Sequence, residues 1–202
     1  MNRSYVLTYS VISSGILLLV LAFQWNIVDF LTPLLTLPLL GIAWLLQMLG
    51  VILSFLFVYR RRRDGVAAFV PLAVSALAIL LAIFVPFTQM WLHVNFDMHK
   101  AAREQIIAKV RSGALKPNVS YDDNLIALPK SYNVSMGGEE IIVQGALKNP
   151  YVFFFTYRGI LDSYSGFLWV PKGKDPRNFM DSGEAGGEIV PFGGDWYFIG
   201  HN

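Results

Sequence analysis

The chain contains no cysteine, few histidines and almost no charge in its first half. None of its 202 residues is a cysteine, so a disulfide framework and a cysteine-based metal or redox site are excluded. An exported domain without disulfides has to fold on its hydrophobic core alone. The histidines are His93, His99 and His201, and no H-E-x-x-H motif occurs. We therefore predict neither a metal site nor a cofactor.

Charge is distributed unevenly along the chain. Five basic and two acidic residues precede His93, and eleven basic and twelve acidic residues follow, so the two parts carry net charges of +3 and −1. The overall charge of +2 comes from one arginine cluster. Nucleic-acid binding needs a basic face spread over a folded domain. The sequence therefore predicts no nucleic-acid partner.

Three apolar segments occupy residues 1–92. They cover residues 5–23, 34–59 and 66–92, and none contains a charged residue. Each has about the length of 20 residues that a helix needs to cross a bilayer. The first is followed by "QWNIVDF" and by no small-residue cleavage site, so we expect an uncleaved anchor. We predict a membrane α-helical region of three transmembrane helices, with the lipid bilayer as its partner.

A loop at residues 60–65 joins the second and third segments and carries four consecutive arginines: Arg60, Arg61, Arg62 and Arg63. Positive residues in short loops stay cytoplasmic. The protein is then expected in the bacterial cytoplasmic membrane, with its amino terminus in the cytoplasm. In this arrangement "QWNIVDFLTP" is an outer loop, and residues 93–202 lie outside the membrane. Trp25 and Trp91 would lie near the outer interface. The alternative use of the arginines is a site for anionic lipid or a partner.

Small and polar residues recur three and four positions apart in the second and third segments, which favours close packing of two helices. These residues are Ala43, Gln47, Gly50 and Ser54, and Ala68, Pro71, Ser75, Ala78 and Ala82. Gln47 is interpreted as an interhelical hydrogen-bonding residue. Alternatively, Gln47 is a polar residue in a permeation path, which would require the protein to oligomerise around Gln47. The three segments lack the ionisable residues that are typical of transporters.

The second half changes from helical to strand periodicity. Met98, Ala102, Ile106 and Val110 recur every four residues and predict an amphipathic helix at about 95–112, capped by Asn95 or Asp97. Alternating segments then predict a small α+β extracytoplasmic domain with a mostly antiparallel sheet. Its expected strands lie around 124–128, 140–144, 151–158, 166–170, 188–192 and 196–200, with a Gly193–Gly194 turn between the last two and a loop at 171–187.

The stretch "YVFFFTYRGILDSYSGFLWVP" begins at Tyr151 and holds the candidate binding residues. Its first strand is apolar on both faces, which predicts a central strand covered on each side. Arg158 and Asp162 flank the turn that follows. They are interpreted either as a structural ion pair or as a site where Arg158 holds an anionic ligand. The candidate ligand or partner-binding residues are Arg158, Asp162, Tyr164 and Ser165.

Signals for catalysis are weak, and we predict no catalytic residue. The chain has no G-x-S-x-G motif. Neighbouring carboxylates at 122–123 and 139–140 would point apart and are interpreted as solvated edges.

The leading hypothesis is a non-enzymatic membrane protein whose outer domain binds another membrane or envelope protein, or a second copy, as an accessory subunit or a protective or sensing factor. The alternative is a membrane-anchored extracytoplasmic hydrolase that uses Arg158, Asp162 and a histidine.

Overall fold

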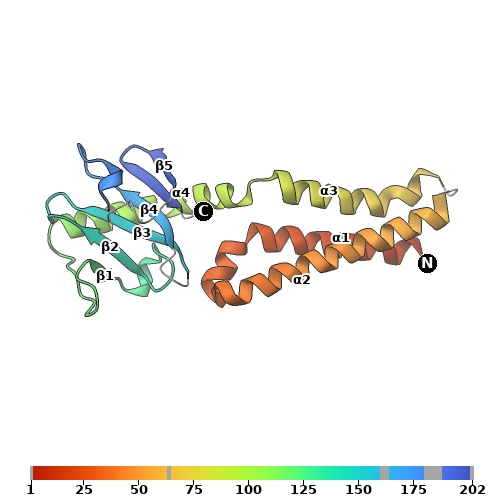
Figure 1. Ribbon diagram of the computed structural model, residues 1–202, viewed down its shortest axis with the longest axis horizontal. Helices are drawn as coiled ribbons and strands as arrows, with labels where there is room; N and C mark the ends of the chain where they lie inside the picture. The colour runs from red at the N-terminus through yellow and green to blue at the C-terminus, as the bar shows by residue number, and fades with distance from the viewer. Residues whose placement is uncertain (1, 63–64, 160–163, 180–187, 201–202) are drawn as a thin grey trace. The chain divides into compact units, whose positions relative to one another are not determined.

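The chain folds into two compact units, Met1–Leu92 and His93–Asn202. The structure is a computed structural model that describes residues 2–62, 65–159, 164–179 and 188–200. The first unit is helical, and the second is built on a six-stranded antiparallel sheet (Figure 1). The predicted fold class, a three-helix apolar region followed by an α+β domain, is confirmed.

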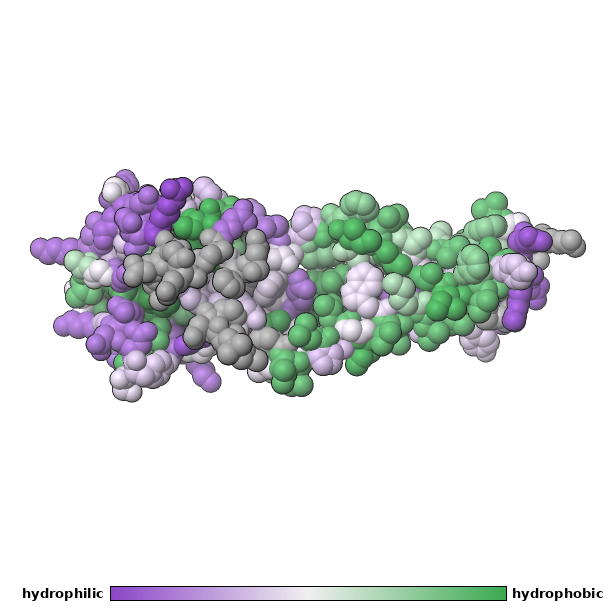
Figure 2. Space-filling view, viewed as in Figure 1, coloured by the Kyte–Doolittle hydropathy of each residue, from purple (hydrophilic) through white to green (hydrophobic). Residues whose placement is uncertain are grey.

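The first unit contains three helices that pack against one another: α1 (Arg3–Ala22), α2 (Gln24–Arg61) and α3 (Val70–Phe84), the last preceded by the short 3-10 helix η2 (Val66–Phe69). The stretches Arg3–Ala22, Leu34–Arg61 and Val66–Phe84 are long and apolar enough to cross a membrane. Figure 2 shows that the surface of this unit is largely hydrophobic. A water-exposed surface of that kind would be unstable, so the chain is an integral membrane protein.

Two helix ends differ from the predicted spans. The segment "QWNIVDF", predicted as a loop, is helical and forms the start of α2. Thr32 interrupts α2 with a φ of 71° and a ψ of 157°, immediately before Pro33. The third apolar helix ends at Phe84, because Val85 adopts an extended conformation ahead of Pro86. At Val85 this agrees with the preference of a residue before proline for extended backbone, whereas at Thr32 only the ψ value agrees with it.

The helix α4 (Phe87–Arg111) begins directly after Pro86, earlier than predicted. Neither Asn95 nor Asp97 caps it, because both lie inside the helix. The predicted apolar stripe is also wrong at its first position, since Met98 is exposed. The residues that α4 buries are Leu92, Phe96, Arg103, Ile106, Ile107 and Val110.

The second unit places its strands in the order β1-β2-β3-β4-β6-β5, with every neighbouring pair antiparallel. The strands are β1 (Leu125–Ala127), β2 (Glu140–Gln144), β3 (Tyr151–Arg158), β4 (Tyr164–Trp169), β5 (Glu188–Gly193) and β6 (Trp196–Gly200). All six overlap predicted strands, but β4 begins two residues earlier than predicted and includes Tyr164 and Ser165. The turn between β5 and β6 is one residue later than predicted, at 194–195, because Gly193 pairs with Trp196 after a bulge.

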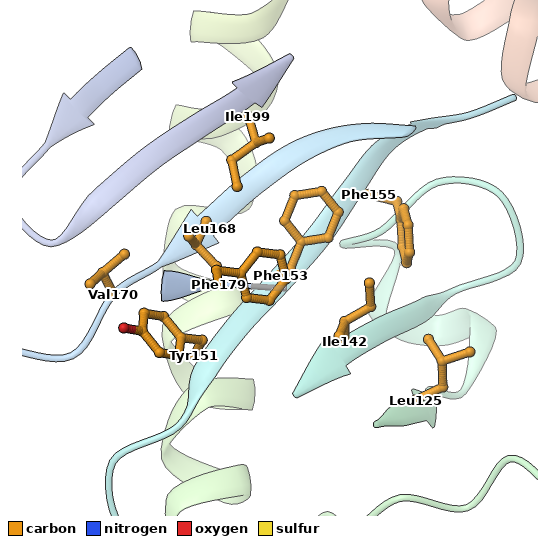
Figure 3. Close-up of a cluster of buried hydrophobic side chains, with 9 residues drawn as sticks. All are labelled: Leu125, Ile142, Tyr151, Phe153, Phe155, Leu168, Val170, Phe179 and Ile199. Atoms are coloured by element: carbon orange, nitrogen blue, oxygen red, sulfur yellow. The ribbon is translucent and has the colours of Figure 1, made fainter. Parts of the chain in front are cut away.

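Strand β3 is covered on both faces, as its composition predicts. On one face Phe154 packs against Trp196 and, through the guanidinium of Arg103, against α4. The opposite face carries Phe153 in a second cluster (Figure 3). Its buried members are Leu125, Ile142, Tyr151, Phe153, Phe155, Leu168, Val170, Phe179 and Ile199. The sheet is therefore the middle layer of the unit.

Phe179 closes this second cluster from the segment that follows β4. Its ring stacks on Phe153 with the centroids 5.5 Å apart, and the hydroxyl of Tyr151 donates to the carbonyl oxygen of Asp175 over 2.9 Å. The first part of the predicted loop 171–187 is thus anchored to the core, and residues 180–187 lie outside the described residues.

Gly166 in β4 sits where two strands leave no room for a side chain. A Cβ atom at this position would lie 2.1 Å from the carbonyl oxygen of Phe154 and 2.7 Å from the ring of Phe153. Both distances are far below van der Waals contact. The glycine in "DSYSGFLW" is therefore required by the pairing of β3 with β4.

The two edge strands of the sheet are protected in different ways. Strand β1 has three residues, and the side chain of Asn118 both accepts from the backbone N–H of Ala127 over 2.7 Å and donates to its carbonyl oxygen over 3.1 Å. Strand β5 contains Pro191, which has no N–H to donate. Short edges and edge prolines both disfavour the addition of another strand.

Candidate functional site

The candidate site is a surface cluster of Tyr121, Glu140 and Arg158, which we call the Glu140 cluster. One carboxylate oxygen of Glu140 accepts a hydrogen bond from the hydroxyl of Tyr121 over 2.9 Å. The other oxygen forms an ion pair with Arg158. Glu140 begins β2 and Arg158 ends β3, so the antiparallel pairing of these strands brings them together. One carboxylate thus fixes an exposed tyrosine and an arginine side by side.

The charge of Arg158 is stabilised where it lies. Partial burial opposes the charge, but the hydrogen bond and negative charge of Glu140 outweigh that effect, and the pKa of Arg158 is raised. The guanidinium also lies 5.2 Å from the centroid of the Phe155 ring. Gly137, with a φ of 72°, lets the loop before β2 pass close to the stem of Arg158. Arg158 therefore remains a cation at every physiological pH.

The other predicted binding residues have different surroundings. Tyr164 pairs with Arg158 across the strands, and its ring packs on Phe153 and Phe155 with centroids 5.4 and 5.9 Å away. Burial raises the pKa of its hydroxyl. Ser165 shares a hydrogen bond of 3.2 Å with Thr156. Asp162 lies outside the described residues. The structure thus places Tyr164 and Ser165 in the packing of the hairpin, and Arg158 in a pair with Glu140.

The interpretation of residues 139 and 140 as solvated edges is wrong. Both are half-buried. Glu139 accepts a hydrogen bond from the backbone N–H of Val134 over 3.2 Å, with its own φ at 57°, and Glu140 holds the cluster described above. The sequence does not reveal that Glu140 pairs with Arg158, 18 residues away, because this pairing depends on the register of β2 against β3.

Arg103 of α4 is a buried cation that the predicted apolar stripe of this helix does not include. Only 1% of it is exposed. Its Nε donates to the carbonyl oxygen of Val134 over 3.1 Å, and one terminal nitrogen donates to Oδ1 of Asn95 over 2.7 Å. The guanidinium carbon lies 4.7 Å from the centroid of Phe167. Arg103 therefore ties the loop before β2 to the helix.

Burial lowers the pKa of Arg103 to about 9, and the negative charge of Glu139 only partly opposes this. The helical periodicity of α4 could have indicated from the sequence that residue 103 is buried. Arg103 lies seven residues after Phe96 and three before Ile106, which is helical spacing on the buried face. Its neutral hydrogen-bond partners and aromatic neighbours are those of a structural cation.

A second polar cluster lies inside the helical unit. Gln47 is fully buried, donates to the backbone carbonyl of Ser75 over 3.0 Å and accepts from the hydroxyl of Ser14 over 3.3 Å. Ser10 and Ser54 share a hydrogen bond of 2.9 Å. The predicted pattern of small and polar residues did not include Ser10, Ser13 and Ser14 of α1, although these residues also recur at helical spacing, next to Gly15. These contacts join helices, as expected for polar groups shielded from lipid.

The predicted small-residue positions are mostly buried between these helices. Gly50 approaches α1 so closely that a Cβ atom would lie 2.8 Å from the hydroxyl of Ser13. Ala78 is buried, and Ala82 near the end of α3 is half-buried. The hydroxyl of Ser75 is buried without a hydrogen-bond partner among the described residues. Close packing of α2 therefore involves α1 as well as the predicted neighbour α3.

The histidines do not gather around a common centre in the described part of the chain. The ring of His93 lies 4.6 Å from that of Phe192, and Nδ1 of His99 hydrogen-bonds the carbonyl oxygen of Asn95 over 2.9 Å. His201 is outside the described residues. Within residues 2–62, 65–159, 164–179 and 188–200, no group of three or more metal-ligating side chains occurs.

Comparisons with known proteins add no relative: no family model matches the chain, and neither a curated protein nor a solved structure is significantly similar to it.

Proposed function

We propose that the protein is non-enzymatic and that residues 93–202 form an extracytoplasmic domain that binds another protein of the membrane or envelope. The observation that carries this proposal is the Glu140 cluster, in which one carboxylate holds Tyr121 and Arg158 together at the surface. The role that fits is an accessory subunit or a protective or sensing factor.

Tyrosine and arginine contribute disproportionately to protein interfaces. The ring of Tyr121 is 69% exposed although its hydroxyl is fixed by Glu140. Fixing such side chains in advance lowers the entropy lost when a partner binds. Because Glu140 compensates the charge of Arg158, the cluster offers an aromatic and hydrogen-bonding surface. That chemistry suits a protein surface better than a polyanion.

The proposed orientation of the domain rests on the arginines at the end of α2. Arg60, Arg61 and Arg62 are exposed there and continue into Arg63. Retention of this loop in the cytoplasm would place the amino terminus inside and, after three crossings, residues 93–202 outside. Because the chain lacks cysteine, single cysteines can report this arrangement. With a membrane-impermeant maleimide, Ala114→Cys should react in intact cells and Ser4→Cys only after lysis. The reverse pattern would refute the orientation.

The hydrolase alternative needs Arg158 in a pocket with a histidine. Arg158 is instead paired with Glu140 and lies over Phe155, while His93 and His99 are both on α4. Within the described residues, which include neither Asp162 nor His201, no observation favours it.

The test of partner binding is site-specific photocrosslinking in the native membrane. A photoreactive amino acid at Tyr121 should form a defined adduct, and the same group at the exposed Lys148 should not. Arg158→Ala should reduce co-purification of the crosslinked protein in mild detergent several-fold, whereas Lys148→Ala should leave it unchanged. A full-length protein that is always monodisperse and alone, with no adduct at Tyr121, would overturn the proposal.

A further inference from the structure

The chain between the first two candidate spans forms a short helix of its own. Residues 24–31 are helical, and the helix stops at Thr32, whose φ of 71° and ψ of 157° lie far from helical values. Pro33 follows, and the candidate span begins at Leu34. The break separates residues 24–31 from the span, so this segment need not share the direction of the helix that crosses the membrane.

This segment has an apolar face and a polar one. Phe23, Ile27 and Phe30 follow at intervals of four and three residues, which places them on one side of a helix. Phe30 is 87% exposed and Phe23 is 55% exposed. Asn26 and Asp29 are the exposed polar residues between them. Two exposed phenylalanines on one short helix form an apolar surface that water solvates poorly.

Three side-chain hydrogen bonds fix how the segment is rotated. The amide of Gln24 and the indole N–H of Trp25 both donate to the hydroxyl of Thr88, over 3.0 and 3.3 Å. The indole N–H of Trp91 donates to Oδ1 of Asn26 over 3.0 Å, and the rings of Trp25 and Trp91 are 6.0 Å apart. These contacts hold one side of the segment against residues 88–91. Phe30 takes part in none of these contacts and is exposed.

We propose that helical residues 24–31, together with Phe23 immediately before them, form an interfacial segment that binds the lipid surface of the bilayer, on the side opposite Arg60–Arg62. Phe23 and Phe30 enter the boundary between headgroups and acyl chains, and Asn26 and Asp29 remain among the headgroups. Amphipathic helices lie in the membrane plane in this manner. The proposal concerns the helical unit and is independent of the partner proposed for the Glu140 cluster.

Lipid is favoured over a protein partner because the apolar face continues into a lipid-facing surface. The exposed residues Leu34, Leu35 and Leu37 follow at the start of the candidate span. Tryptophan indoles prefer the depth at which their ring is in an apolar environment and their N–H has a polar partner. Trp25 and Trp91 have both, since each is half-buried and each N–H is bonded.

The experiment measures depth with spin labels on the otherwise cysteine-free, full-length chain in phosphatidylcholine and phosphatidylglycerol nanodiscs. Labels at Phe30→Cys, Leu37→Cys and Ala114→Cys are compared by their collisions with oxygen and with a water-soluble nickel chelate. We expect the residue-30 label to be several-fold more accessible to oxygen, relative to nickel, than the residue-114 label, and shallower than the residue-37 label.

A second variant tests the clamp. Thr88→Val removes the acceptor shared by Gln24 and Trp25 and should increase the mobility of the residue-30 label without moving the residue-37 label. Nickel accessibility at residue 30 equal to that at residue 114 would show a surface in water and overturn the proposal. Immobilisation of the residue-30 label with little access to either reagent would show a protein contact instead, and would overturn it equally.

Discussion

The side-chain amide of Gln47 in α2 donates to the backbone carbonyl oxygen of Ser75 in α3 over 3.0 Å, and its oxygen accepts from Ser14 in α1 over 3.3 Å. One side chain therefore links all three helices of the first unit. No water is present in the bilayer core to replace such partners. The contacts of Gln47 thus define the rotation and the axial position of each helix relative to the others.

Replacing Gln47 with leucine should destabilise the helical unit by about 1 kcal/mol, the usual size of an interhelical hydrogen bond in a membrane. The loss arises because Ser14 is left without its partner. Unfolding of the full chain in bicelles would measure it. The matched control is Met48→Leu, which changes an exposed neighbour. Equal stability of the two variants would show that Gln47 does not hold the helices together.

Two glycines of α2 provide a paired test of helix packing. A side chain at Gly50 would collide with Ser13 of α1, whereas nothing lies within 4 Å of a Cβ at Gly41. Gly50→Leu should therefore cost about 1–3 kcal/mol through overpacking. Gly41→Leu should be neutral or stabilising by up to about 1 kcal/mol, since leucine is the better helix former. The same unfolding measurement compares them, and a larger loss at Gly41 would contradict the packing of α1 on α2.

Gly166→Ala should prevent the second unit from folding normally. The new methyl group would meet the backbone of Phe154, which cannot move without separating β3 from β4. We expect a loss of about 3 kcal/mol or more, visible as a lower yield of full-length protein and increased cleavage by a protease added to membranes. Gly200→Ala is the control, because its methyl group would meet only the ring of Phe198. Comparable protease resistance of both variants would count against the register of β3 and β4.

The buried Arg103 predicts an unusual dependence of stability on pH. Burial lowers its pKa to about 9 in the folded protein, so above pH 9 the unfolded state, in which Arg103 is solvated, binds more protons. Raising the pH above 9 therefore favours the folded state, by up to about 1.4 kcal/mol per pH unit. Below pH 9 the effect of Arg103 on the free energy of unfolding does not change with pH.

Arg103→Met isolates this effect, because the tyrosines titrate in both proteins. The free energy of unfolding of the wild type should rise relative to that of Arg103→Met between pH 9 and 10.5, as followed by tryptophan fluorescence of the full-length protein. Parallel curves over this range would mean that Arg103 keeps its ordinary pKa and is well solvated.

The sequence predicts the architecture well because its signals are local. Uncharged segments define the spans, and short runs of apolar and aromatic residues bounded by turn-forming residues define the strands. The contacts of the candidate site depend on tertiary structure instead. Glu140 reaches Arg158 only through the register of two strands. Arg103 was missed because arginines are usually solvated, and the helix at 24–31 because a short apolar face among polar residues is difficult to distinguish from a loop.

The protected edges of the sheet have a consequence for crowding in the membrane. Neighbouring copies held in one plane meet often and in similar orientations, which is the situation in which open strand edges fuse into extended assemblies. Asn118 occupies the backbone groups of Ala127 at one edge, and Pro191 lacks a donor at the other. Both features disfavour the merging of sheets when copies collide, which leaves side chains as the means of any lasting association.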